Sequence, residues 1–171
     1  MKKLVKLRAI EPEDINFLYN LENNPSLWHL SHQQQPFSKH LLIQYIKEAD
    51  RDIYEAKQFR FAIEKTEGGN LLGFIDLFDF DPKNKRVGVG IIIKDEGERN
   101  RGYGKDALEQ VIDYCFNVLY VHQIYANISV DNYASIKLFE NQGFKQNGIK
   151  KEWNFDGKNY IDEYFYQLIK L

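Results

Sequence analysis

A strand, a short glycine-bearing loop and a helix follow one another at the centre of this chain, and they constrain its fold more than any other feature. Residues 87–93 are an apolar, β-branched run of strand type, and apolar residues recur with helical spacing from Ala107 to Phe116. The basic loop between them, Arg99 to Gly104, ends where the helix begins. Several free backbone N–H groups and the positive end of the helix dipole therefore point at one place. Such a place suits a phosphate or a pyrophosphate.

Composition indicates an ordinary globular domain. The 171 residues include 23 basic and 25 acidic side chains, and 43% are hydrophobic, which is enough for a substantial core. We expect a single domain over residues 1–171. The formal net charge of -2 gives no global basic field, so we expect no nucleic-acid partner. No segment approaches the ~20 apolar residues of a membrane span, and we expect a cytoplasmic protein without a membrane contact.

The lone cysteine, Cys115, falls on the apolar stripe of the central helix. A single cysteine cannot form an internal disulfide, which suits a reducing compartment. We interpret it as a packing residue and not as a catalytic thiol.

Hydrophobic period and turn signals predict an α/β (α+β) chain with the order strand, two helices, three strands, helix, strand, helix and two strands. The three strands before the central loop form an antiparallel meander, whereas the strand–helix–strand unit through the loop makes its two strands parallel. The result is a mixed, mostly antiparallel sheet. The expected ranges are a strand at 4–9, helices from Pro12 to about Glu22 and from Ser38 to Ala49, strands at 58–64, 71–80 and 86–93, a helix at 102–119, a strand at 123–130, a short helix from Asn132 to Gly143, and a hairpin with arms at 144–155 and 160–171. Residues 24–36 are expected to form a loop.

Two familiar phosphate-binding motifs fit the central loop poorly. A Walker A loop needs a glycine where Arg99 stands and a hydroxyl where Asp106 stands. A dinucleotide fingerprint tolerates Gly102-x-Gly104-x-x-Ala107 but needs its first glycine close to the strand end, and eight residues separate Ile93 from Gly102.

A third pattern fits better. Arg99-x-x-Gly102-x-Gly104, after a β-branched strand and before an amphipathic helix, resembles motif A of the GNAT superfamily of acyl-CoA-dependent N-acetyltransferases. Further stretches lie in the order of that family, so the resemblance covers essentially the whole chain, and it looks closest to the bacterial spermidine N-acetyltransferases. They are Leu-Arg-Ala-Ile-Glu-Pro-Glu-Asp at 7–14, Gly-Phe-Ile-Asp-Leu at 73–77, His-Gln-Ile-Tyr at 122–125, Asp131-Asn132-x-x-Ser135, Leu138-Phe139-Glu140 and Gly143-Phe144.

The resemblance implies transfer of an acetyl group from acetyl-CoA, as cosubstrate, to a primary amine, by direct attack in a ternary complex and without a metal. A polyamine or another small amine is the implied acceptor, and the spermidine relatives assemble into homo-oligomers. Pantetheine is expected between the strands at 86–93 and 123–130, where a bulge at Gly88 or Gly90 would leave backbone N–H groups free. The residues expected to bind the cofactor are Ile91, Ile92, Ile93, Arg99, Asn100, Arg101, Gly102, Tyr103, Gly104, Lys105, Asn132 and Phe139.

Removal of the amine proton needs a base, directly or through water. Asp76 and Asp79 lie three residues apart on a predicted strand, so alternation places them on opposite faces unless a bulge intervenes. Acidic residues at the position of Asp79 meet the polyamine in the spermidine enzymes, and we therefore favour Asp79, with Asp76 second. A carboxylate at a strand end in solvent is the simpler alternative for each.

The sequence departs from the family at two places. Phe139 stands where a tyrosine is taken to protonate the CoA thiolate, so water, Tyr133 or Tyr103 must supply that proton. An acidic pair of the spermidine enzymes is here Gln34-Gln35. These glutamines, Glu22 and Trp28 are the expected acceptor-side residues, although Trp28 suits the core equally well. Alternative functions are acetylation of protein N-termini or lysines, and an acyl-CoA sensor with little catalysis.

Overall fold

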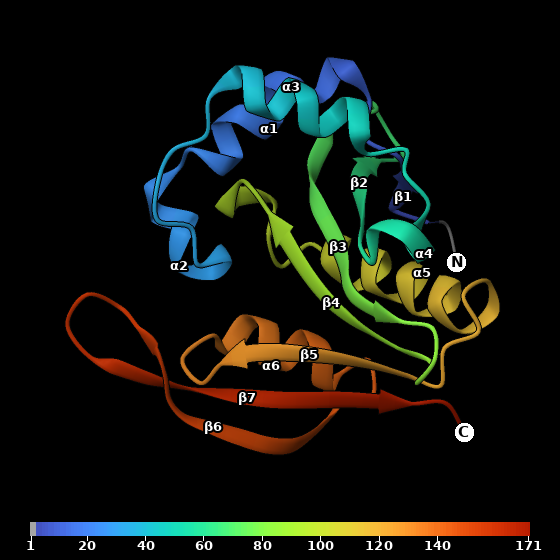
Figure 1. The fold of residues 1–171 in the computed structure, drawn as a ribbon, viewed down its shortest axis with the longest axis vertical. Helices are drawn as coiled ribbons and strands as arrows, with labels where there is room; N and C mark the ends of the chain where they lie inside the picture. The colour runs from blue at the N-terminus through green and yellow to red at the C-terminus, as the bar shows by residue number, and fades with distance from the viewer. Residues whose placement is uncertain (1–2) are drawn as a thin grey trace.

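The computed structural model describes residues 3–171 and confirms a mixed α/β fold with one mostly antiparallel sheet. Seven strands follow one another across this sheet in the order β1-β2-β3-β4-β5-β7-β6 (Figure 1). The strands are β1 (Val5–Arg8), β2 (Phe59–Lys65), β3 (Leu71–Asp81), β4 (Arg86–Ile93), β5 (Gln123–Ser129), β6 (Lys145–Phe155) and β7 (Tyr160–Ile169). The α-helices are α1 (Ile15–Glu22), α2 (Trp28–Ser31), α3 (Lys39–Glu48), α4 (Ile53–Ala56), α5 (Tyr103–Asn117) and α6 (Tyr133–Glu140), with 3-10 turns at Pro12–Asp14, Pro25–Leu27 and Glu96–Glu98.

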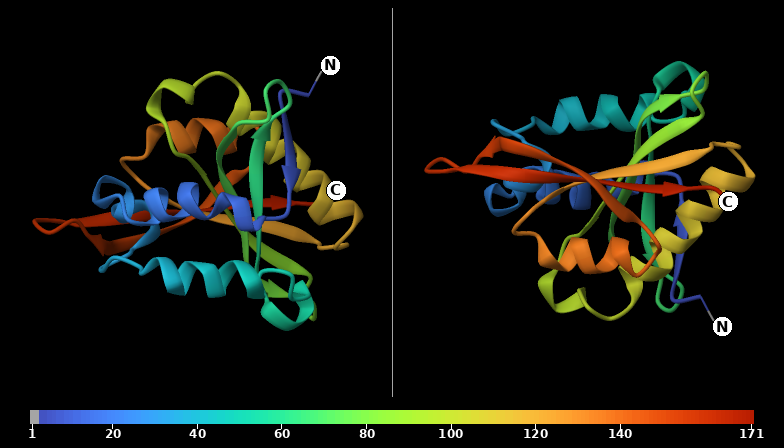
Figure 2. Two further views of the ribbon diagram at one scale, coloured as in Figure 1. Left: turned by 90° about the horizontal axis from the view of Figure 1, so that it is seen from above. Right: turned by 90° about the horizontal axis from the view of Figure 1, so that it is seen from below.

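All neighbouring strands are antiparallel except β4 and β5, which are parallel as the strand–helix–strand pattern predicted. The connection between them runs through α5 and crosses one face of the sheet. Figure 2 shows α1 and α3 on one side of the sheet and α5 and α6 on the other. We call these sides the α1 face and the α5 face.

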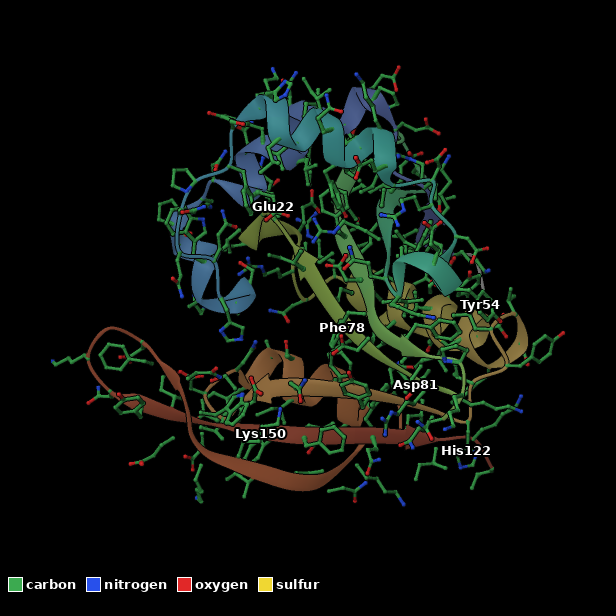
Figure 3. All side chains as sticks on the ribbon, viewed as in Figure 1. Glu22, Tyr54, Phe78, Asp81, His122 and Lys150 are labelled. Carbon is green, nitrogen blue, oxygen red and sulfur yellow. The ribbon has the colours of Figure 1, made fainter. Side chains whose placement is uncertain are left out.

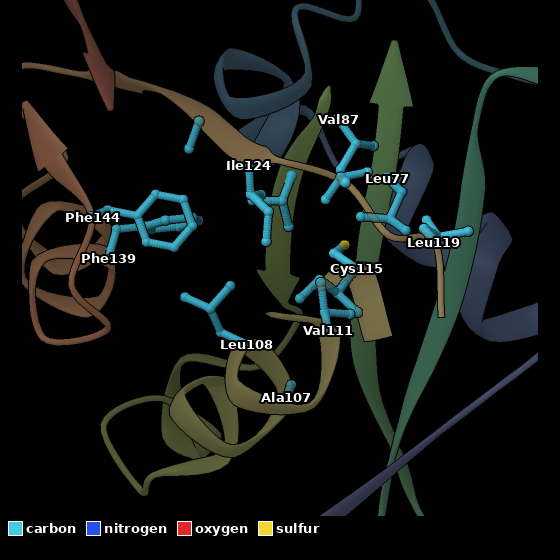
Figure 4. Packing of buried hydrophobic residues seen from close by; sticks show 14 of the residues in the cluster. Leu77, Val87, Ala107, Leu108, Val111, Cys115, Leu119, Ile124, Phe139 and Phe144 are labelled. Carbon is cyan, nitrogen blue, oxygen red and sulfur yellow. The ribbon is translucent and has the colours of Figure 1, made fainter. Parts of the chain in front are cut away.

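Each face has its own apolar core. On the α5 face, the stripe of α5 that the sequence predicted, Ala107, Leu108, Val111 and Cys115, is fully buried against the sheet (Figure 4). Burial raises the pKa of Cys115 to about 12, which confirms a packing residue. On the α1 face, α1 and α3 cover a smaller core whose members include Leu18, Leu42 and Phe74.

The segment expected to be a loop contains more structure than its composition suggested. Pro25–Leu27 forms a 3-10 turn and α2 follows it directly, so the expectation of an irregular segment over residues 24–36 was wrong. The Asn24 side chain caps the turn by accepting a hydrogen bond from Ser26 N, and Pro25 takes the first helical position. The Asn23 side chain joins the two ends of this segment. Its Oδ1 accepts from Phe37 N at 2.7 Å, and its Nδ2 donates to Phe37 O at 3.0 Å. The helix α4 was also not predicted from the sequence.

Gly73 offers a test of the packing between β3 and β4. A Cβ added there would lie 1.9 Å from the backbone oxygen of Ile92, which cannot move without breaking the strand pairing. We expect Gly73→Ala to lower the free energy of unfolding by at least about 1–3 kcal/mol. Gly97→Ala is the matched control, because a Cβ at Gly97 meets nothing within 4 Å, and it should change stability by less than about 0.5 kcal/mol. Urea denaturation measures both; equal stabilities for the two variants would contradict this register.

Candidate functional site

The centre of the candidate site is the place where β4 and β5 part. They pair over three positions only, Arg86↔Gln123, Val87↔Ile124 and Gly88↔Tyr125. Beyond Gly88 the two strands diverge, and Figure 1 shows their arrowheads pointing away from each other. Meanwhile β4 stays paired with β3 up to Ile93, and β5 stays paired with β7 up to Ser129. The opening between β4 and β5 therefore lies inside the sheet, bordered by main-chain groups.

The direction of those main-chain groups follows from the antiparallel ladder. The N–H of Lys94 donates to Leu72 O of the neighbouring chain segment, at 2.9 Å. Because hydrogen-bonded pairs alternate in such a ladder, the N–H and C=O of Ile92 point toward β3, whereas those of Ile91 and Ile93 point toward the opening. Of the three isoleucines expected at the cofactor, two thus present their backbone to the opening. The side chain of Ile92 packs into the core of the α1 face.

The loop before α5 is held to the end of β4. Arg99 donates from Nε to Ile93 O at 3.1 Å and from Nη2 to Lys94 O at 3.3 Å. Asn100 and Gly102 both have left-handed backbone, with φ of 60° and 87°. Gly102 is the N-cap of α5, so the first N–H groups of a 15-residue helix are directed at the loop without intrahelical partners.

The remaining basic side chains of the loop lie at the surface. The side chain of Arg101 is 60% exposed and lies 3.4 Å from Glu98, and that of Lys105 is 58% exposed, 3.8 Å from Glu109. Asp106 faces the other way: its Oδ2 accepts hydrogen bonds from the N–H groups of Leu4 and Val5, at 2.6 and 2.9 Å. An acidic side chain in the first turn of α5 is thus bound to β1.

The expected bulge at Gly88 or Gly90 is absent, because the register between β3 and β4 is regular from Gly73↔Ile93 to Phe78↔Gly88. Gly88 has a different role. A Cβ at this position would lie 2.2 Å from the ring of Phe78, so the glycine makes room for that ring. The ring also packs edge-on against Tyr125 of β5, at 5.7 Å between centroids.

A bulge does occur in β3, at Asp79. Two residues, Asp79 and Phe80, stand opposite one residue of β4 between the pairs Phe78↔Gly88 and Asp81↔Arg86. Asp79 has a φ of 48°, which aspartate tolerates better than most residues. Because of the bulge, the Phe80 side chain is buried in the core of the α5 face and the Asp79 side chain lies on the α1 face. The exception to alternation that the sequence analysis allowed, a bulge between Asp76 and Asp79, is therefore present, and both residues lie on the α1 face.

The two aspartates differ in their partners. Asp76 accepts two hydrogen bonds from Arg60, at 2.5 and 2.9 Å, and the same guanidinium donates to Glu22 at 2.6 Å. Burial alone would lower the pKa of Arg60, but the charge and hydrogen bonds of Asp76 outweigh burial and raise the pKa. The carboxylates of Asp76 and Glu22 thus share one partly buried cation.

Asp79 has a hydroxyl partner instead. Tyr125 donates to Asp79 Oδ2 at 3.2 Å, and burial together with the carboxylate raises the pKa of Tyr125 to about 12. Asp79 forms no ion pair with any residue of the described range 3–171. It lines a cavity of about 390 Å³ together with Asp81, Arg86, Gln123, Tyr125, Phe165 and Gln167.

The expected acceptor-side residues fall into two groups. Glu22 and Trp28 form one unit, because the indole N–H of Trp28 donates to Glu22 O at 2.8 Å. Glu22 also lines a second cavity of about 390 Å³ with Tyr45, Arg60, Asp76 and Phe78. Gln34 and Gln35 form the second group. They are exposed in the segment after α2 and line neither of the two cavities.

The structure places Asn132 and Phe139 in structural positions. Asn132 is the N-cap of α6, and its Oδ1 accepts from Ser135 N at 3.2 Å. The ring of Phe139 is 3% exposed and packs on Phe144 at 5.0 Å, so it lines no open surface. Contact of Phe139 with the cofactor stays a prediction.

Sequence reasoning missed two residues of this site, Arg60 and Tyr125. Arg60 stands between Phe59 and Phe61. A cation that is flanked by apolar residues in a strand indicates a partner of opposite charge. Tyr125 alternates with buried Ile124 and Ala126, which places its ring on the α1 face.

Two kinds of feature are absent from residues 3–171. No helix in this range is long and apolar enough to cross a membrane. No group of three or more His, Cys, Asp or Glu residues in the same range is placed to hold a metal ion.

Comparison with known proteins agrees with this geometry. Residues 5–145 match the family model of the acetyltransferase (GNAT) domain. Spermidine N(1)-acetyltransferase of Vibrio cholerae is 27% identical over 165 residues, which cover 95% of this chain and 91% of that protein. A crystal structure of spermidine N-acetyltransferase from Vibrio cholerae in complex with CoA and spermine superposes with a TM-score of 0.86 at 26% identity, covering 98% and 96% of the two chains. A dodecameric structure of the same enzyme in an intermediate state gives 0.80 at 27% identity, with 98% and 95% covered.

The pairing of Asp79 with Tyr125 can be tested by titration. Asp79→Asn removes the charge that disfavours the phenolate, so the pKa of Tyr125 should fall from about 12 and remain above 10 because burial persists. Asp81→Asn is the control: Asp81 lines the same cavity but bonds Asn84 and Arg86, and it should leave the pKa of Tyr125 unchanged. NMR of ¹³Cζ-labelled tyrosines, assigned with Tyr125→Phe, reports the value. An identical shift in both variants would rule out the specific contact.

Proposed function

This chain belongs to the GNAT acetyltransferase family and is an acetyl-CoA-dependent N-acetyltransferase; we propose that its acceptor is a small amine of the polyamine class, attacked directly in a ternary complex. One observation carries the proposal. The opening between β4 and β5 lies between the N-terminus of α5, on one side, and Asp79, a carboxylate without an ion pair in the described chain, on the other. The N-terminus of α5 can hold an anion, and the Asp79 carboxylate can hold an ammonium.

We place the CoA pyrophosphate at the loop from Arg99 to Gly104. The N–H groups of the first turn of α5 supply donors, and the left-handed backbone at Gly102 lets the chain approach closely without a Cβ. Arg101 and Lys105 are exposed and add positive charge. The N–H and C=O of Ile91 and the N–H of Ile93 point into the opening and are available to the pantetheine amides, whereas Ile93 O already accepts from Arg99 Nε.

The acetyl-accepting amine belongs on the α1 face beside Phe78, Tyr125 and Asp79. Asp79 can accept the proton of the incoming amine, directly or through water, or bind a second ammonium of the same molecule. Asp76 is unsuited to the role of base, because Arg60 already occupies both of its oxygens. The relationship to spermidine acetyltransferases over nearly the whole chain supports a polyamine-class acceptor.

Protonation of the departing thiolate cannot involve Phe139, which has no acidic proton. Tyr103 lies beneath the Lys65 ammonium, 5.3 Å from ring centroid to Nζ. Tyr133, the first residue of α6, is 76% exposed. We assign this proton to Tyr133 or to water. We also propose that residues 1–171 act as one catalytic domain, and that the chain assembles into a homo-oligomer, in line with the dodecameric Vibrio cholerae structure.

The experiment that tests this function is acetyl-CoA-dependent thiol release with spermidine, spermine, putrescine, aromatic amines, amino acids and peptides. We expect turnover of di- or polyamines. Asp79→Asn should lower that turnover by about 100-fold while CoA affinity stays within about twofold, and Asp81→Asn should have a far smaller effect. Turnover of peptides alone would instead indicate a protein acetyltransferase. CoA binding with no turnover of any amine would indicate a sensor.

The position of the pyrophosphate can be tested at two glycines with similar backbone. Gly102 has a φ of 87° and Gly157, in the turn between β6 and β7, a φ of 95°. Alanine is strained at both by about 1–2 kcal/mol, but only Gly102 borders the loop. Gly102→Ala should weaken CoA binding by about tenfold, and Gly157→Ala should leave it unchanged. Calorimetric titration with CoA measures both affinities. Equal CoA affinities for Gly102→Ala and Gly157→Ala would place the pyrophosphate elsewhere.

A further inference from the structure

A second polar cluster lies on the α1 face, on the strands beyond the opening. Glu163 of β7 is 5% exposed, which is rare for a glutamate and requires a partner. Its Oε1 lies 3.1 Å from Nζ of Lys150, on β6, and its Oε2 accepts from Asn154 at 3.1 Å. Lys150 also donates to Asn127 Oδ1 at 2.9 Å, so the ammonium joins three strands. Figure 3 shows Lys150 below Phe78 of β3, and Glu22, at the end of α1, above both.

The groups around the Lys150 ammonium are those that would bind an ammonium ligand. They are a buried carboxylate, an amide oxygen and an aromatic face, since Nζ lies 5.1 Å from the centroid of the Trp153 ring. Carboxylates and indole faces are the usual components of protein sites for organic cations. We call the set of Glu163, Asn127 and Trp153 the cation cage.

The cation cage lies on the same face as Asp79 and at the other side of the opening. Tyr125, the partner of Asp79, stands opposite Gln167, and Glu163 lies four residues along β7 from Gln167, or about 13 Å at the rise of a strand. Asn127 belongs to the part of β5 that has already separated from β4. An acceptor whose terminal nitrogen reacts at the opening could thus extend its chain toward Asp79 or toward the cage.

Four other carboxylates on this face have a cation partner. Arg60 pairs with both Glu22 and Asp76, Arg86 lies 3.2 Å from Asp81, and Lys150 pairs with Glu163. Asp79 is the one of these five carboxylates without an ion pair in residues 3–171. This set therefore offers one carboxylate without a cation partner to an acceptor.

From this arrangement we infer that Lys150 occupies a second ammonium subsite, and that it restricts the acceptor to amines with one ammonium beyond the reacting nitrogen. The substrate class is then a diamine and not a tri- or tetra-amine. This inference rests on the proposed function, since it concerns the acceptor of the same site. Lys150 is a specificity-determining residue and takes no part in the chemistry.

The test compares Lys150→Met with Lys151→Met. Lys151 is the matched control, because it is the next residue, its side chain is 72% exposed, and it pairs with Asp162 at 2.8 Å. Thiol release is measured with putrescine, spermidine and spermine. We expect the native chain and Lys151→Met to favour putrescine in kcat/KM. Lys150→Met should lower the KM for spermidine about tenfold relative to that for putrescine, because a vacated carboxylate gains one charge-assisted hydrogen bond. Lys150→Arg, which keeps the positive charge, should retain the native preference.

Several outcomes would overturn the inference. A native preference for spermidine over putrescine would do so, as would a ratio of KM values that is the same in Lys150→Met and Lys151→Met. If Lys150 had only a structural role, Lys150→Met would have the same ratio of KM values as Lys151→Met and a lower melting temperature. If Lys150→Met does not fold, Lys150→Gln removes the charge and still donates a hydrogen bond to Glu163.

Calorimetric binding of putrescine and spermidine in the presence of CoA separates this inference from the proposed function. Absence of turnover with every amine would reject the polyamine acetyltransferase proposal. Even then, the binding data test the cation cage. The same ratio of spermidine to putrescine affinity in Lys150→Met and the native chain would reject the cage, and a higher affinity of Lys150→Met for spermidine alone would support it.

Discussion

The site depends on one constraint, the separation of β4 and β5 after three residue pairs. A parallel pair of central strands would ordinarily continue its ladder, and leaving main-chain groups unpaired inside a sheet costs free energy. Here β5 turns away from β4 because it stays paired with β7 along its length, while α5 and α6 fill the α5 face behind the opening. The N-terminus of α5 and the loop before it can then approach the ends of both strands.

Much of this arrangement can be read from the sequence because local patterns determine it. The β-branched run before a glycine-bearing loop and the helical stripe at Ala107, Leu108 and Val111 predict the strand, the loop and the buried helix face directly. The parallel pairing of β4 and β5 follows from the length of the connection. The order of the strands across the sheet was not predicted, since several orders satisfy the same hydrophobic pattern.

Other features could not be predicted because they depend on contacts between distant segments. The bulge at Asp79 reverses the face of that residue, and nothing in β3 signals it, since Phe78, Asp79, Phe80 and Asp81 alternate between apolar and acidic as in a regular strand. The buried pairing of Arg60 with Asp76 and Glu22 joins residues 16 and 38 positions apart. The cap at Asn132 and the core position of Phe139 show, conversely, that residues within a family motif also stabilise the fold.

The contact between Phe78 and Gly88 also limits how the sequence can vary. The ring of Phe78 fills the space that any side chain at position 88 would need, and the two residues stand opposite each other in adjacent strands. Positions 78 and 88 are therefore not independent. Descendants of this fold that acquire a side chain at position 88 must carry a smaller residue at position 78, and the pair is expected to covary. Since the Phe78 ring also packs against Tyr125, such an exchange would move side-chain volume from one strand to the next beside Tyr125.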